Sequence, residues 1–73
     1  MDKETAMKRL ALWALIARNS YGGRRFQRAM DHAITLENAT GLSVISPEMV
    51  DFHEWADMTF GHKAQMRGWW GLA

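Results

Sequence analysis

The longest uninterrupted apolar run in the chain, LALWALIA, covers residues 10–17. On a helix, at 100° per residue, the apolar side chains of this region fall on opposite faces. One face carries Ala6, Leu10, Trp13 and Ala17, and the other carries Leu12, Leu15 and Ile16. A helix that is apolar all round is covered on both sides, and a chain of 73 residues has little material for that.

This helix is therefore either the centre of the fold or a helix that packs its second face against another chain. We favour the second arrangement, which predicts a homodimer formed through the first helix or through the C-terminal tail. Residues 1–35 carry seven Lys and Arg against three Asp and Glu, whereas residues 36–73 carry two against five. These charges allow pairing within one chain or between two, but the simplest interpretation is two oppositely charged helix faces that stay solvated.

Turn-forming residues divide the chain into three helical segments and a tail. The divisions fall at Gly22-Gly23, at residues 38–41, at Ser46-Pro47 and at Gly61. They predict helices over about 3–19, 24–37 and 47–60, followed by a tail over 61–73. We therefore predict an all-α fold in which one domain, residues 1–73, forms a small bundle of three main helices plus a short C-terminal turn or helix.

The second and third helices carry signals for their inner faces and their ends. The inner stripe of the second is predicted to be Phe26, Ala29, Met30, Ala33 and Ile34. Gly41 suits the left-handed turn that ends it, and LSVI, residues 42–45, is expected to cross over in an extended form. Ser46 is expected to cap the third helix with Pro47 at its first position, where a missing N–H costs nothing, and Gly61 is expected to stop it. Its inner face carries Met49, Phe52, Ala56 and Phe60, with His53 among them.

The composition argues against catalytic and metal chemistry. Without cysteine there is neither a disulfide framework nor a thiolate zinc site. No nucleophile stands near a plausible base and no phosphate-binding glycine loop is present, so we predict no enzyme activity and no cofactor. His53, Glu54 and Asp57 match the zinc-protease pattern HExxH only in part, because Asp57 replaces the second histidine. We predict no metal, and we expect the His53 imidazole to bond to the backbone.

The chain also lacks the pattern of a membrane-spanning or secreted protein. Its eight-residue apolar run is far short of the about 18–20 residues that cross a bilayer. The start, MDKETAMKRL, is mixed in charge, whereas a signal peptide begins with basic residues. We therefore expect a cytoplasmic protein with no membrane span.

Three arginines, Arg24, Arg25 and Arg28, open the second helix directly after Gly22-Gly23. Free backbone N–H groups and the positive end of the helix dipole lie at the same place, which suits a phosphate or an acidic protein surface. One interpretation is a small DNA-binding regulator with this helix in the major groove. Against it, the net charge is only +1, and about six to ten phosphate contacts need more bases than one face provides. A solvated arginine face needs no ligand, and we rank nucleic acid below a protein as the partner.

Tryptophan and methionine are over-represented, with four Trp and six Met in 73 residues. Trp and Arg are enriched at interface hot spots, and Met gives an adaptable contact surface. The C-terminal tail either folds back over the core or forms a patch that docks on a partner, and an interfacial membrane anchor is a third alternative. We predict that Trp69, Trp70 and Arg67 bind a partner, with Trp55 and Met58 as flanking anchors.

Together these features predict a small non-enzymatic binding protein, a regulator or inhibitor, that docks on a larger host protein. The size and composition are similar to those of the small accessory proteins that phages, plasmids and other mobile elements encode to bind and disable a host machine. This similarity is one of character and transfers no residue. The alternative is a helical DNA-binding regulator that uses Arg24, Arg25 and Arg28.

Overall fold

The computed structural model describes residues 2–20 and 22–66, and within them the chain forms helices joined by short turns, with no strand. The helices are α1 (Lys3–Arg18), α2 (Gly23–Thr40), the short 3-10 helix η1 (Pro47–Met49) and α3 (Val50–Ala64). The predicted all-α fold with three main helices is therefore confirmed. Of the predicted tail, residues 67–73 lie outside the described residues.

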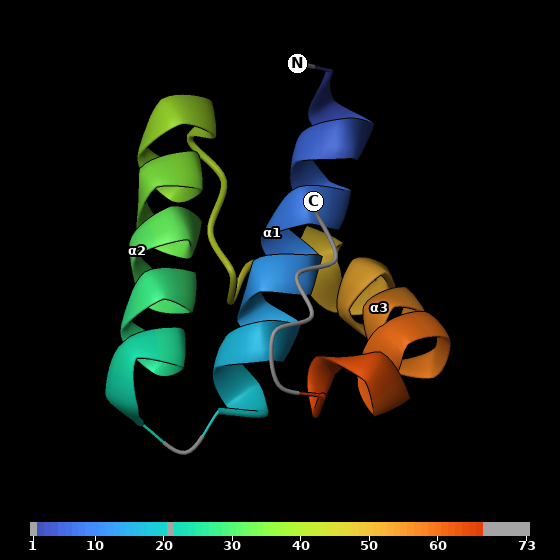
Figure 1. Cartoon of the computed structure of the whole chain (residues 1–73). Helices are drawn as coiled ribbons and strands as arrows, with labels where there is room; N and C mark the ends of the chain where they lie inside the picture. Colours follow the sequence, from blue (N-terminus) through green and yellow to red (C-terminus); the bar gives the residue numbers. More distant parts are fainter. Residues whose placement is uncertain (1, 21, 67–73) are drawn as a thin grey trace.

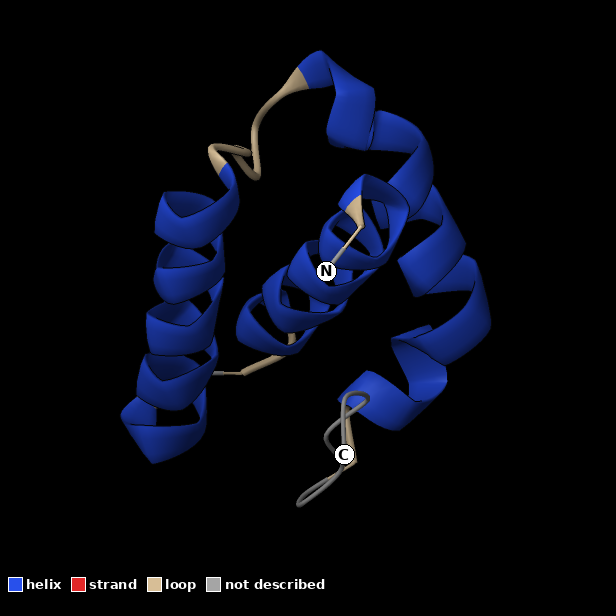
Figure 2. Cartoon of the chain, turned by 90° about the horizontal axis from the view of Figure 1, so that it is seen from above, coloured by secondary structure: helices blue, strands red, loops and turns tan. Residues whose placement is uncertain are grey.

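Helix α1 runs through the centre of the bundle, between α2 and α3 (Figures 1 and 2). Nine of its sixteen residues are buried, and Leu10, Leu15 and Ile16 have 0% of their surface exposed. The prediction that its second face, with Leu12, Leu15 and Ile16, packs against another chain is wrong. The reason is that both apolar faces are already covered within one chain.

A short chain can enclose this helix because the core is built largely from small residues. Of the fourteen buried apolar residues in the described part of the chain, eight are alanines, and Ala11, Ala29 and Ala56 among them are 0% exposed. Packed helix axes lie about 8–10 Å apart depending on the side chains between them, and small side chains allow the closer approach. Little side-chain volume is then needed to fill the core. Among residues 2–20 and 22–66, no polar or charged residue is buried.

The ends of α1 and α2 follow from local hydrogen bonds. Asp2 caps α1, because its Oδ1 accepts a hydrogen bond from the backbone N–H of Thr5 at 2.7 Å. Hydrogen bonds from the side chain and the backbone of Thr5 lower the pKa of the Asp2 carboxyl, which keeps this acceptor charged at the positive end of the helix dipole. Helix α2 continues about one turn beyond the predicted Glu37 and ends at Thr40. Gly41, which follows it, has a φ of 75° and gives the predicted left-handed turn.

Helix α3 continues through Gly61 to Ala64, so the predicted stop at Gly61 is wrong. A glycine weakens a helix by only about 1 kcal/mol relative to alanine, and Ala64 one turn later is 0% exposed. Packing of the last turn therefore outweighs the local preference. At the other end, Ser46 and Pro47 occupy the predicted cap and first positions, here of η1, although the Ser46 side chain makes no capping hydrogen bond.

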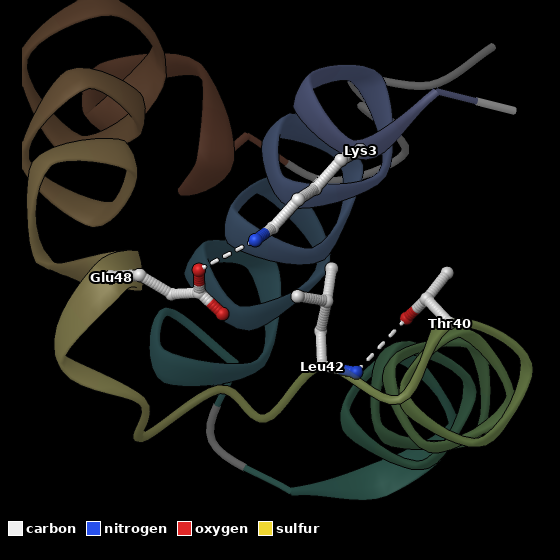
Figure 3. A network of polar contacts seen from close by, with 4 residues as sticks. All are labelled: Lys3, Thr40, Leu42 and Glu48. Carbon is white, nitrogen blue, oxygen red and sulfur yellow. Dashed lines mark hydrogen bonds and ion pairs between the residues drawn. The ribbon is translucent and has the colours of Figure 1, made fainter.

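The segment that follows α2 packs back on the bundle as predicted, but it turns at Val44 and Ile45 and is not extended throughout. Leu42 and Val44 are half-buried against the core, whereas Ile45 is 90% exposed. Leu42 donates its backbone N–H to Thr40 Oγ1 at 3.3 Å, as Figure 3 shows. These contacts bring the segment back from α2 to the start of η1.

Figure 3 also shows an ion pair that joins the basic first half of the chain to its acidic second half. Lys3 Nζ lies 3.0 Å from Glu48 Oε2, and the two side chains are 68% and 44% exposed. An exposed pair of this kind contributes about 0–1 kcal/mol. It positions η1 beside the start of α1 but does not determine the stability of the fold.

Candidate functional site

An apolar groove of about 440 Å³ lies between α1 and α2. Three alanines from the two helices line it: Ala14, Ala17 and Ala33. Three larger side chains of α2 line it as well: Phe26, Met30 and Ile34. Its polar lining comes from Arg18, Glu37 and His53, and Val44 from the loop completes it. We call this surface the α1–α2 groove.

The apolar stripe of α2 lines the groove and is only partly buried in the core. Of the stripe predicted to face inward, only Ala29 and Ala33 are buried, while Phe26 is 38% and Ile34 is 46% exposed. The prediction that Phe26 and Ile34 lie in the core is therefore wrong. Ala17 of α1 and Ala29 of α2 lie in one buried cluster with Ile16. Phe26 and Ile34 lie instead on the open flank of α2, where they line the groove.

The polar residues of the groove differ in charge and in how they are held. Arg18 is exposed in the last turn of α1, whereas the Glu37 carboxylate accepts a hydrogen bond from the Val44 N–H at 2.7 Å. His53 Nε2 lies 2.8 Å from the Val44 carbonyl oxygen, which confirms the predicted backbone partner of this imidazole. Because α1 and α2 are antiparallel (Figure 1), Arg18 lies near the start of α2 and Glu37 near its end. The groove is thus positive at one end and negative at the other.

A second surface lies on α3, where Asp51, Glu54, Trp55, Met58 and Thr59 line an open depression. Trp55 is half-buried, and its ring meets Phe60 edge-on at 5.6 Å between centroids. The ammonium of Lys8 lies 5.6 Å from the centroid of the Trp55 ring, within the range of a cation–π contact. Met58 beside it is 79% exposed. We call this the Trp55–Met58 surface.

The structure therefore brings two of the five predicted partner-binding residues, Trp55 and Met58, into one surface. Trp55 is held in place by its neighbours, and Met58 projects into solvent. The other three, Arg67, Trp69 and Trp70, lie outside the described residues. The acidic side chains of α3 were expected to form a solvated helix face. Two of them, Asp51 and Glu54, line the depression and make its edge negative.

The three predicted arginines of the phosphate- or acidic-surface site do not act as one cluster. Arg24 and Arg28 are exposed on α2. Arg25 is half-buried and donates a hydrogen bond from Nη2 to the backbone carbonyl of Ala64. Its guanidinium therefore links the start of α2 to the last turn of α3, where carbonyl groups lack partners within the helix.

This difference predicts unequal effects of substitution. Arg25→Ala is expected to lower the free energy of unfolding by about 1–3 kcal/mol, because it removes a charged hydrogen bond that connects two helices. Arg24→Ala and Arg28→Ala are matched controls and are expected to change it by no more than about 0.5 kcal/mol. Urea titrations followed by circular dichroism measure all three. Equal effects at the three positions would contradict a structural role for Arg25.

The described residues contain neither a candidate metal cluster nor a membrane-spanning helix. No group of three or more His, Cys, Asp or Glu side chains among them is arranged to hold a metal ion, and none of their helices is long and apolar enough to cross a membrane. No protein-family model matches the chain, and no curated protein or solved structure matches it either.

Proposed function

We propose that this chain is a small non-enzymatic binding protein that regulates or inhibits a larger protein and docks on it through the Trp55–Met58 surface. The observation that carries the proposal is the position of Met58, 79% exposed beside a half-buried Trp55 in one depression. In the proposal the chain acts as a homodimer in the cytoplasm, and Arg67, Trp69 and Trp70 add contacts to the same partner.

The physical character of this surface supports docking on a protein. A tryptophan that is already fixed by Phe60 and Lys8 loses little conformational freedom on binding, and an exposed methionine adapts its shape to a partner. Tryptophan is also among the residues that most often dominate binding energy at protein interfaces. The carboxylates of Asp51 and Glu54 at the rim favour a partner segment in which apolar side chains are flanked by lysine or arginine.

We expect Met58→Asp to abolish capture of the partner, because it places a charge at the centre of the apolar contact. Immobilised wild-type chain and variants are incubated with lysate of the native host, and the retained proteins are identified by mass spectrometry. Val50→Asp is the matched control, since Val50 is 59% exposed on the same helix but does not line the depression. We expect one protein to be retained by the wild type and by Val50→Asp but not by Met58→Asp. Titration of the purified chain with that protein then confirms the binding.

A second substitution tests the tail. The double variant Trp69→Ala/Trp70→Ala is expected to weaken binding of the partner while the helical circular dichroism and the melting temperature stay nearly unchanged. The reason is that truncating an aromatic hot spot typically costs about 2 kcal/mol or more of binding energy, about thirtyfold in Kd. Unfolding of the double variant would instead assign the two indole rings to the core.

The alternative function, a DNA-binding regulator, has less support. Of its three arginines, only Arg24 and Arg28 are exposed, because Arg25 bonds to Ala64. Binding to duplex DNA would weaken steeply with salt, with a slope of about −0.9 per phosphate contacted. Docking through Trp55 and Met58 is mainly apolar, so its affinity would fall less steeply with salt, through the carboxylates at the rim alone. The slope of a salt titration therefore separates the two functions.

A further inference from the structure

We infer that the α1–α2 groove is the surface through which two copies of this chain pair, with α2 of the second copy lying antiparallel in it. The inference rests on the homodimer included in the proposed function and gives it a defined interface. It does not depend on the larger protein that docks at the Trp55–Met58 surface. The two surfaces share no lining residue.

The apolar stripe on α2 is suited to pair with a second copy of itself. Phe26, Met30 and Ile34 are spaced by four residues, so they lie about 6 Å apart along one flank of the helix. A two-fold axis through Met30 places the two copies of Met30 against each other and pairs each Phe26 with Ile34 of the second copy. A contact of this kind is isologous, in which the same patch serves both copies.

The alanine lining of the groove also favours a second helix there. Ala14, Ala17 and Ala33 leave room beside the stripe, so a second helix can approach closely. The partly exposed side chains Phe26 and Ile34 have the size to fill that room from the second copy. In the proposed pair the stripe of each copy enters the groove of the other, and both features are present on every chain.

The charges at the two ends of the groove favour the same antiparallel pairing. Arg18 lies at the end of the groove near the start of α2, and Glu37 lies near the end of the same helix. The antiparallel two-fold arrangement brings Arg18 of each copy to the end that carries Glu37 of the other. The two pairs form simultaneously, whereas a parallel arrangement would place like charges together.

The resulting assembly has a familiar architecture. Helices α1 and α2 form an antiparallel pair joined by a short connection (Figure 1). Two such pairs, packed through the open flanks of their α2 helices, make a four-helix bundle. The C-terminal end of α3 leads away from the groove, because it lies by Arg25, on the opposite flank of α2 from the stripe.

Sedimentation equilibrium of the full chain at about 10–300 μM tests the interface. The wild type is expected to have twice the mass of the 8.4 kDa chain. Met30→Asp places two carboxylates at the two-fold axis and is expected to raise the dissociation constant by about a hundredfold or more. Ile45→Asp is the matched control, since Ile45 is 90% exposed outside the groove, and it is expected to remain dimeric. Circular dichroism verifies that each variant is folded.

Charge reversal gives a second test that does not depend on a single variant. Arg18→Glu and Glu37→Arg are each expected to weaken dimerisation by about tenfold or more, because each places like charges together at both ends of the interface. An equimolar mixture of the two variants is expected to form a dimer again. In a mixed dimer with one chain of each variant, both ends of the interface again join a carboxylate to a guanidinium. This recovery excludes simple loss of folding as the cause.

Three results would overturn the inference. They are a single-chain mass for the wild type at about 300 μM, a folded Met30→Asp variant that is still dimeric, and a mixture of the charge variants that stays monomeric. If the wild type is monomeric and Met30→Asp no longer binds the larger partner, the groove is a binding site for that partner and not for a second copy. Met58→Asp is expected to lose the larger partner and to remain a dimer. The docking proposal and the dimer proposal can therefore fail independently of each other.

Discussion

Leu15→Ala is expected to leave the chain largely unfolded at about 25 °C. Leu15 is 0% exposed on the central helix α1, and truncation of a buried leucine to alanine costs about 2–5 kcal/mol. A single core in a chain of this size supplies only about 3–5 kcal/mol in total. The loss is therefore comparable to the whole stability of the fold, and urea titration followed by circular dichroism measures it.

The matched control is Ile45→Ala, which removes apolar atoms from a side chain that is 90% exposed. It is expected to change the free energy of unfolding by no more than about 0.5 kcal/mol. A Leu15→Ala variant as stable as this control would mean that α1 is not enclosed as described.

The second large effect is expected from adding volume. Ala56→Leu is expected to destabilise the fold by about 1–3 kcal/mol or more, because Ala56 is 0% exposed in the cluster where α3 packs on α1. The added side chain forces the two helices apart, and the close approach that lets a short chain enclose α1 is lost. Thermal unfolding followed by circular dichroism gives the change in melting temperature.

Ala39→Leu is the control for this substitution. Ala39 is exposed near the end of α2, and leucine forms helices nearly as well as alanine. This variant is expected to melt close to the wild type. If Ala56→Leu also melts there, the alanines do not set the distance between the helices.

Local sequence signals predicted the helices well, but they did not predict how deeply each side chain is buried. Gly41 and Pro47 marked helix boundaries correctly, because positive φ and a missing N–H act within a few residues. Periodicity placed Phe26 and Ile34 on the inward side of α2, yet it carries no information about the distance between helices. That distance depends on the alanines of α1 and α2, which meet only in the folded chain.

The same limit explains the second face of α1 and the length of α3. A helical wheel counts Ala11 and Leu15 equally as apolar, and it does not show how little volume alanines need. Gly61 is a local signal, and the burial of Ala64 that overrides it is a tertiary contact.

Residue type alone predicted part of the candidate site. The character of the Trp55 and Met58 side chains predicts a docking surface, and the structure brings the two together. Arg25 cannot be distinguished from Arg24 and Arg28 by sequence, since its partner, the Ala64 carbonyl, is a backbone group 39 residues away. The groove was missed because the apolar pattern of α2 predicts that its lining residues lie in the core.

Isotope-filtered NMR on a mixture of labelled and unlabelled chains tests most directly whether α1 is enclosed by its own chain while the stripe of α2 meets a second one. Contacts between chains are expected at the Met30 methyl group and between Phe26 and Ile34, and none are expected at Leu10 or Leu15. Contacts between chains at Leu15, or their absence at Met30, would contradict this arrangement.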